Sequence, residues 1–119
     1  IGFHAHNNQN LAFANTIETM SYGVSYLDAT AMGMGRGAGN CAMELLLGFL
    51  KNPKYNLYSL LTFIENYMVP LKESGITWGY DIQYMLTGQL NRHPREAMAF
   101  TAENRRDYCE FYKSLLENF

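Results

Sequence analysis

The chain opens with the stretch Ile1-Gly2-Phe3-His4-Ala5-His6-Asn7-Asn8. Its apolar start predicts a short strand from Ile1 to Ala5. Because side chains of a strand repeat every two residues, His4 and His6 are expected on the same face. Two neutral imidazoles at this spacing can bind one transition-metal ion, and nearby amide, carboxylate or water ligands would favour manganese or magnesium. A pair of hydrogen-bonded structural histidines is the alternative.

A helix and a second strand are predicted next. Asn10 is the expected N-cap of a helix from Leu11 to Tyr22. The segment from Val24 to Ala31 then predicts a strand with Asp28 and Thr30 on one face. A strand, a helix and a strand joined by short connections form a βαβ unit with parallel strands. Functional groups in such units gather at the carboxyl ends of the strands, where the histidines lie.

Glycines occupy alternate positions in the run Gly33-Met34-Gly35-Arg36-Gly37-Ala38-Gly39-Asn40. Glycine permits backbone conformations closed to other residues and lets a ligand approach closely. Asn40 is the expected N-cap of a helix from Cys41 to Leu50, whose N-terminus and loop amides would form an anion-binding cup containing Arg36. A glycine-rich turn without a ligand is the alternative. The spacing matches neither the dinucleotide nor the Walker motif, so nucleotide binding is not expected.

The order of these motifs resembles the metal-dependent aldolases and lyases built on a TIM barrel. That family includes 4-hydroxy-2-oxovalerate aldolase, hydroxymethylglutaryl-CoA lyase, and the isopropylmalate and homocitrate synthases. The resemblance covers residues 1–50 and includes Leu-Ala-x-Ala-Asn, Asp-x-Thr and Glu44 besides the histidine and glycine stretches. It implies an α/β fold in which residues 1–50 form the last two parallel strands of a (β/α)8 barrel and residues 51–119 a C-terminal helical region. The compact glycine loop is most similar to that of the 4-hydroxy-2-oxovalerate aldolases.

The same resemblance implies a metal site. The family's His-x-His pair ligates a divalent metal, which carries onto His4 and His6, and its loop asparagine suggests Asn40 as a further ligand. The expected cofactor is therefore Mn²⁺ or Mg²⁺. The Arg-Asp-Gly segment of the family's first barrel strand, which supplies an aspartate ligand, has no counterpart here. The chain is thus expected to be a fragment that is inactive alone.

Substrate contacts and proton transfer are assigned to other residues. Arg36 and Asn8 are the candidates for binding the substrate. Tyr84, or failing that Tyr80, lies in a segment similar to the family's Gly-Tyr-x-x-x-Tyr and is the candidate for assisting proton transfer. Buried aromatic packing is the alternative role for either tyrosine.

The resemblance implies that the intact protein cleaves carbon–carbon bonds of 2-oxo acids such as 4-hydroxy-2-oxovalerate, with the metal stabilising an enolate. A Claisen-type acyl-CoA condensing synthase and a non-catalytic assembly fragment are the alternatives. Two strands taken from a barrel leave open edges and an apolar face, so a homo-oligomer is expected. The resemblance to the aldolases also implies an aldehyde dehydrogenase as an expected partner of the intact protein.

Composition limits the other classes of partner. A net charge of -2 gives no electrostatic reason to expect nucleic acid or an anionic membrane. No apolar run reaches the roughly 18 residues that a membrane-spanning helix needs. The two cysteines, Cys41 and Cys109, lack a metal-type spacing, and a reduced, cytoplasmic setting is expected.

Beyond residue 50 the apolar spacing predicts helices. The first carries a stripe from Leu57 to Met68 and is expected to end at Pro70. A short helix ending near Gly88 follows, then one from Arg95 to Phe100 with His93 as a surface or capping residue. The last is expected from Ala102 to Phe119, with Tyr108, Phe111, Tyr112 and Leu115 on its buried face.

Overall fold

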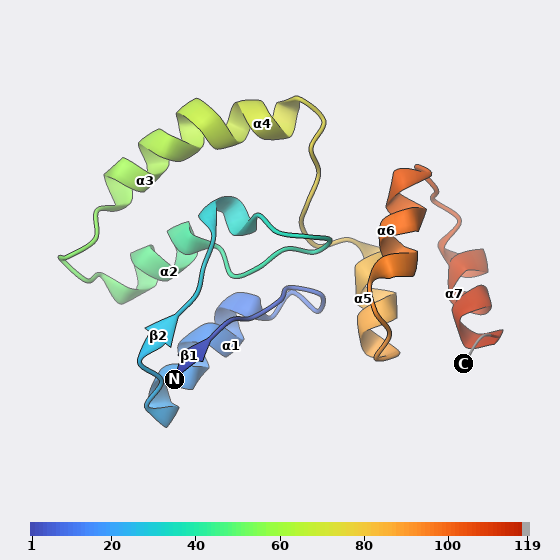
Figure 1. The fold of residues 1–119 in the computed structure, drawn as a ribbon, viewed down its shortest axis with the longest axis horizontal. Coiled ribbons are helices and arrows are strands. Elements are labelled where there is room, and N and C mark those ends of the chain that lie inside the picture. The colour runs from blue at the N-terminus through green and yellow to red at the C-terminus, as the bar shows by residue number, and fades with distance from the viewer. Residues whose placement is uncertain (118–119) are drawn as a thin grey trace.

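The computed structural model describes residues 1–117 and contains a two-stranded parallel sheet. Strand β1 (Gly2–Phe3) pairs with β2 (Tyr26–Leu27), and the helix α1 (Ala12–Glu18) with the 3₁₀ turn η1 (Thr19–Tyr22) connects them. Figure 1 shows this βαβ unit at the N-terminal end of the chain. The predicted parallel pairing is confirmed. Both strands are shorter than predicted because, within the described residues, each has only the other as a ladder partner.

The N-caps predicted for the first two helices are wrong. Asn10 adopts a left-handed φ of 62° at the end of a turn, and the Asn7 side-chain oxygen instead accepts the Ala12 N–H at 3.1 Å. Asparagine tolerates this backbone region, which explains its place in the turn. Asn40 does not cap α2 (Met43–Leu50) either; Ala42 holds the cap position. The 3₁₀ turn η2 (Ala31–Gly33) begins the glycine loop that leads to α2.

The helix after α2 runs through the proline that was expected to close it. It consists of α3 (Leu57–Phe63), a π-helical turn η3 (Ile64–Met68) and α4 (Val69–Glu73), which contains Pro70. The Val69 N–H donates to the Ile64 carbonyl, five residues back. A π turn widens the helix just before the proline, whose ring would otherwise clash with the preceding turn. The predicted packing stripe is only partly buried: Met68 is buried, Leu60 and Ile64 are half-buried, and Leu57 and Leu61 are exposed.

Three helices form the C-terminal part of the molecule: α5 (Ile82–Gln89), α6 (Arg95–Ala102) and α7 (Tyr108–Glu117). His93 Nδ1 accepts the Arg95 N–H at 3.1 Å, which confirms its predicted capping role. The last helix begins later than predicted because α6 extends to Ala102 and a turn follows. Tyr112, expected on the buried face, is 43% exposed. The predicted extension to Phe119 lies outside the described residues.

Most of the buried apolar side chains form two separate groups, and Met68 and Trp78 lie outside both. One lies between the sheet, α1 and α2; its members are Ala5, Ala12, Cys41 and Leu46. The other joins α5, α6 and α7 to the glycine loop; its members are Ala38, Tyr84, Ala97, Phe100, Phe111 and Leu115. The radius of gyration is 16.2 Å, against about 13.5 Å for a compact domain of this length. The molecule is therefore flat and extended, as Figure 1 shows.

Helices α3 and α4 lie along the N-terminal part, with α3 against α2 and η3 against η2. The division of the chain at residue 50 stays a prediction. Within residues 1–117, no helix has both the length and the apolar character to cross a membrane.

Candidate metal centre

The two N-terminal histidines lie side by side at the end of β1. Their ring centroids are 5.0 Å apart with the rings edge to face. Ala5 between them is only 8% exposed and belongs to the buried group beneath the sheet. The alternation expected of an extended segment is thus confirmed, with both imidazoles on one side and the small apolar residue on the other.

Asn40 lies directly across from the second histidine. His6 and Asn40 form an antiparallel bridge, supported by a 3.0 Å hydrogen bond from the Asn7 N–H to the Gly39 carbonyl. Opposed residues in such a bridge carry side chains on the same face, with Cβ atoms about 5 Å apart. The bridge therefore brings Asn40 next to His6, which lies 34 positions earlier in the chain.

The amide of Asn40 has a defined orientation. Its Nδ2 donates to the Met34 carbonyl at 3.0 Å, and the Thr30 hydroxyl donates to the same carbonyl at 2.7 Å. Because a carbonyl can only accept, the NH₂ of the amide must face it. The Oδ1 atom is thereby left available as a ligand.

Two glycines of the loop make room for this arrangement. A Cβ at Gly35 would collide with the Asn40 side-chain amide. Gly39 has a left-handed φ of 82°, and a Cβ there would collide with the Gly33 carbonyl. The alternating glycines therefore let the loop close tightly around Asn40.

Asp28 orients the first histidine. Its Oδ2 lies 3.1 Å from His4 Nδ1. A carboxylate only accepts, so the neutral imidazole carries its proton on Nδ1 and presents the lone pair of Nε2. Sequence reasoning placed Asp28 on a face of the second strand but gave it no role. The strand register held the signal: Phe3 pairs with Leu27, and the next residues along the two strands are His4 and Asp28.

These donors fit a divalent cation that accepts mixed nitrogen and oxygen ligands, such as Mn²⁺. Two imidazole nitrogens and one amide oxygen make only a partial set. Residues 1–117 contain no group of three or more His, Cys, Asp or Glu that could hold a metal. Cys41, next to Asn40 in the chain, belongs to the buried group beneath the sheet and is 1% exposed, and burial raises the pKa of its thiol.

A family model described as HMGL-like matches residues 1–65, more than half of the chain. The chain belongs to the HMGL-like family. The resemblance expected from the histidine and glycine motifs is confirmed by this match.

Known proteins of several kinds are similar to this HMGL-like chain. The 4-hydroxy-2-oxovalerate aldolase of Chloroflexus aurantiacus is 40% identical over 117 residues, which covers 82% of this chain and 34% of that protein. An oxaloacetate decarboxylase of Mycobacterium tuberculosis is 53% identical over 51 residues, 43% of this chain and 15% of the decarboxylase. The crystal structure of the N-terminal domain of a candidate aldolase from Bacteroides vulgatus superimposes with a TM-score of 0.69 at 39% identity, covering 84% of this chain and 34% of that one. This chain thus spans about a third or less of the length of these relatives.

The contacts of the other predicted site residues are made with segments other than the histidine pair. The Tyr84 ring packs on Gly37 of the loop, but its hydroxyl is 3.1 Å from Thr101 Oγ1 on α6, and the side chain is 7% exposed. The alternative, Tyr80, is exposed. Their catalytic roles stay predictions.

The two predicted substrate contacts also differ in their surroundings. Arg36 is exposed at the tip of the glycine loop, where its carbonyl accepts the Gly39 N–H at 3.2 Å. Asn8 is half-buried beside Gly88 of α5, and the neighbouring Gln9 donates to the Met85 carbonyl at 2.9 Å. Helix α5 therefore supports the segment that follows the histidines.

Proposed function

We propose that this protein is a divalent-metal-dependent carbon–carbon lyase acting on 2-oxo acids, with 4-hydroxy-2-oxovalerate as the preferred substrate. The observation that carries the proposal is that the His4 and His6 rings lie side by side after β1 while a backbone bridge pairs His6 with Asn40. Several relatives are named 4-hydroxy-2-oxovalerate aldolase. Cleavage of that substrate leaves the enolate of pyruvate, whose developing negative charge a cation stabilises.

Each residue of the centre has a proposed role. His4 and His6 bind the ion as neutral imidazoles, and Asp28 holds the His4 Nδ1 proton so that Nε2 faces the ion. Asn40 contributes its Oδ1, since its Nδ2 is held by Met34. When bound, the ion supplies Lewis-acid stabilisation of charge on the oxygens of the 2-oxo acid.

Substrate recognition is assigned to the edges of the centre. The exposed guanidinium of Arg36 suits the substrate carboxylate, because its fork of N–H donors matches two carboxylate oxygens. The amide of Asn8 is the second proposed contact. We further propose that residues 1–50 are part of a (β/α)8 barrel, and that a carboxylate ligand from elsewhere in that barrel completes the set.

Decarboxylation of oxaloacetate is a second candidate, favoured by the 53% identity to the decarboxylase over 51 residues. Both reactions break a bond next to the C3 carbon of a 2-oxo acid and leave the pyruvate enolate. They differ in the co-product, which is an aldehyde in one and carbon dioxide in the other. Measuring the release of carbon dioxide, and identifying the aldehyde by chromatography of its hydrazone apart from that of pyruvate, separates the two activities.

The test of the metal centre is Mn²⁺ binding measured by electron paramagnetic resonance of the free ion. His4→Ala and His6→Ala should each abolish binding, because each removes one of the two nitrogen donors. Asn40→Ala removes only a neutral amide and should weaken binding measurably while both imidazoles still hold the ion. His93→Ala is the matched control, since that ring caps α6. Unchanged Mn²⁺ affinity in both N-terminal variants would refute the ligand assignment.

A further inference from the structure

Met32 has a strained backbone that two side chains hold in place. Its φ of 55° and ψ of 22° lie in the left-handed region, which is unfavourable for a residue with a long side chain. Its N–H donates to Glu44 Oε1 at 2.8 Å, and its carbonyl accepts the Trp78 indole N–H at 2.9 Å. The backbone N–H and carbonyl of Met32 are thus held by the side chains of Glu44 and Trp78, 12 and 46 positions further along the chain.

The residues just after Met32 determine where Asn40 lies. The Gly33 carbonyl accepts the Asn40 backbone N–H at 2.9 Å. The Met34 carbonyl accepts the Asn40 side-chain Nδ2 at 3.0 Å. A rotation of the backbone at Met32 would move both acceptors, and with them the direction of Asn40 Oδ1.

A pocket of about 270 Å³ lies against this part of the loop, lined among others by Met32, Gly33 and Asn40. Local hydrogen bonds run from the Gly33 N–H to the Thr30 carbonyl and from the Met34 N–H to the Ala31 carbonyl. The hydrogen bonds of Glu44 and Trp78 add two long-range restraints on Met32 itself.

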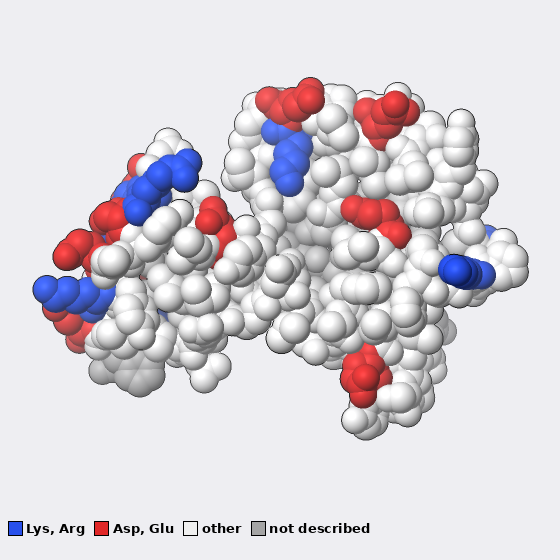
Figure 2. Space-filling model, turned by 180° about the vertical axis from the view of Figure 1, so that it is seen from behind, with Lys and Arg blue, Asp and Glu red and all other residues white. Residues whose placement is uncertain are grey.

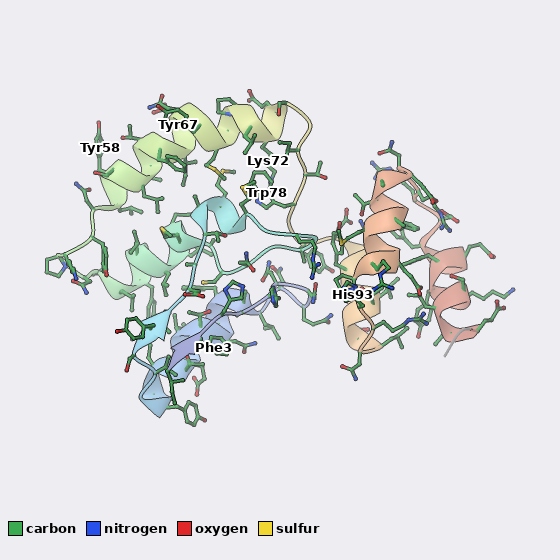
Figure 3. The ribbon with its side chains drawn as sticks, in the orientation of Figure 1. Phe3, Tyr58, Tyr67, Lys72, Trp78 and His93 are labelled. Carbon is green, nitrogen blue, oxygen red and sulfur yellow. The ribbon has the colours of Figure 1, made fainter. Side chains whose placement is uncertain are left out.

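Trp78 is itself well anchored. Its side chain is 8% exposed, and the Lys72 ammonium of α4 lies 4.8 Å from the ring centroid; both residues are labelled in Figure 3. The next residue, Gly79, donates its N–H to the Gly37 carbonyl at 3.0 Å. The segment between α4 and α5 thus donates two hydrogen bonds to η2 and the glycine loop, one to Met32 and one to Gly37.

We infer that Glu44 and Trp78 are positioning residues for the metal ligand Asn40: by holding Met32 in its left-handed conformation, they aim Asn40 Oδ1 at the ion. This inference rests on the proposed metal centre for its effect on affinity. The contacts themselves exist in the metal-free protein, so one readout does not require the metal.

The first experiment measures Mn²⁺ affinity in the full chain. Glu44→Ala and Trp78→Phe remove one hydrogen bond each and should weaken binding about tenfold, the size typical of groups that orient a metal ligand. Glu44→Gln keeps an acceptor for the Met32 N–H and should retain most of the affinity. Glu65→Gln and Tyr67→Phe, both exposed on η3, are controls that should leave it unchanged.

A double-mutant cycle separates positioning from general loss of structure. If the two residues act through Asn40, neither variant should weaken Mn²⁺ binding further in an Asn40→Ala background. Equal losses in both backgrounds, or no loss in either, would overturn the inference. Met32→Gly should restore affinity to Glu44→Ala, because glycine adopts the left-handed conformation without support; absence of restoration also counts against it.

The second readout is the side-chain amide signal of Asn40 in the nuclear magnetic resonance spectrum of the metal-free chain. Glu44→Ala and Trp78→Phe should shift or broaden this signal, whereas Tyr67→Phe should not. An unmoved Asn40 signal would overturn the inference even where Mn²⁺ binds. If the unaltered chain binds no Mn²⁺, the proposed function fails while this spectrum still decides the positioning role.

Discussion

The N-terminal βαβα unit and the C-terminal helices bury their apolar side chains very differently. The helices α5 to α7 enclose large residues, with Phe100, Phe111 and Leu115 at most 3% exposed. The core of the N-terminal unit consists mainly of small side chains such as Ala5 and Ala12. Among the described residues, the large apolar side chains that remain exposed lie almost entirely before residue 83; the exceptions are Tyr112 and Leu116.

Charge follows the same division. On the face in Figure 2, lysine, arginine and acidic side chains gather over the C-terminal helices, while the larger N-terminal part shows few of them. The region that carries the candidate ligands is thus the one that leaves apolar surface uncovered. The region without candidate ligands is the one that buries large apolar side chains. The candidate metal centre therefore lies on a scaffold with apolar surface available for further contacts.

The largest effect is expected in the helical core. Phe100→Ala should lower the free energy of unfolding by about 3–5 kcal/mol, because a fully buried ring leaves a cavity. Urea denaturation followed by circular dichroism measures it. Tyr112→Ala, on the same group of helices but exposed, should change stability by about 0.5 kcal/mol or less. Similar values for both variants would mean that α5 to α7 have no core of their own.

The uncovered N-terminal surface should drive self-association. At roughly 25 cal/mol per Å² of apolar surface buried, covering the strand edges and the α3 stripe stabilises an oligomer. Sedimentation velocity of the 119-residue chain at micromolar concentration should show a dimer or larger species. Leu61→Lys on α3 should weaken association, whereas Leu116→Lys on α7 should not. A stable monomer would contradict the expectation.

A smaller effect is expected at the residue that orients His4. Asp28→Ala should weaken Mn²⁺ binding about tenfold, since loss of a carboxylate partner frees the tautomer and rotation of the imidazole. Isothermal titration measures the affinity. Glu73→Gln at the end of α4 is the control. If Asp28→Ala binds as tightly as the unaltered chain, the Nδ1 hydrogen bond has no part in the centre.

The smallest effect concerns acid stability of the helical part. The Arg105 side chain hydrogen-bonds Asp107 and lowers the pKa of that carboxyl below its ordinary 3.8. A carboxyl whose pKa is lower in the folded than in the unfolded chain stabilises the fold at every pH above the unfolded pKa. This contribution is lost as the pH falls through the lowered pKa of the folded chain. Thermal unfolding from about pH 5 down to about pH 2 should therefore show a slightly steeper loss for the unaltered chain than for Asp107→Asn. Identical slopes would show that the exposed pair contributes nothing.

Local sequence pattern was enough to predict several features. The two-residue period places His4 and His6 on one face, and the order of strand, helix and strand predicts parallel pairing. The family can also be predicted from local motifs, because the histidine and glycine stretches identify it without knowledge of the folded structure. These features depend on residues close together in the chain, where backbone geometry alone determines the outcome.

Contacts between distant segments decided the rest. Asn40 looked like a helix cap but became the partner of Met34 and His6, and Pro70 looked like a helix end but lies within α4. Trp78 carried no signal for its bond to Met32, 46 positions away. Each polar group has several possible partners along the chain, and only the folded backbone brings one of them within hydrogen-bonding distance.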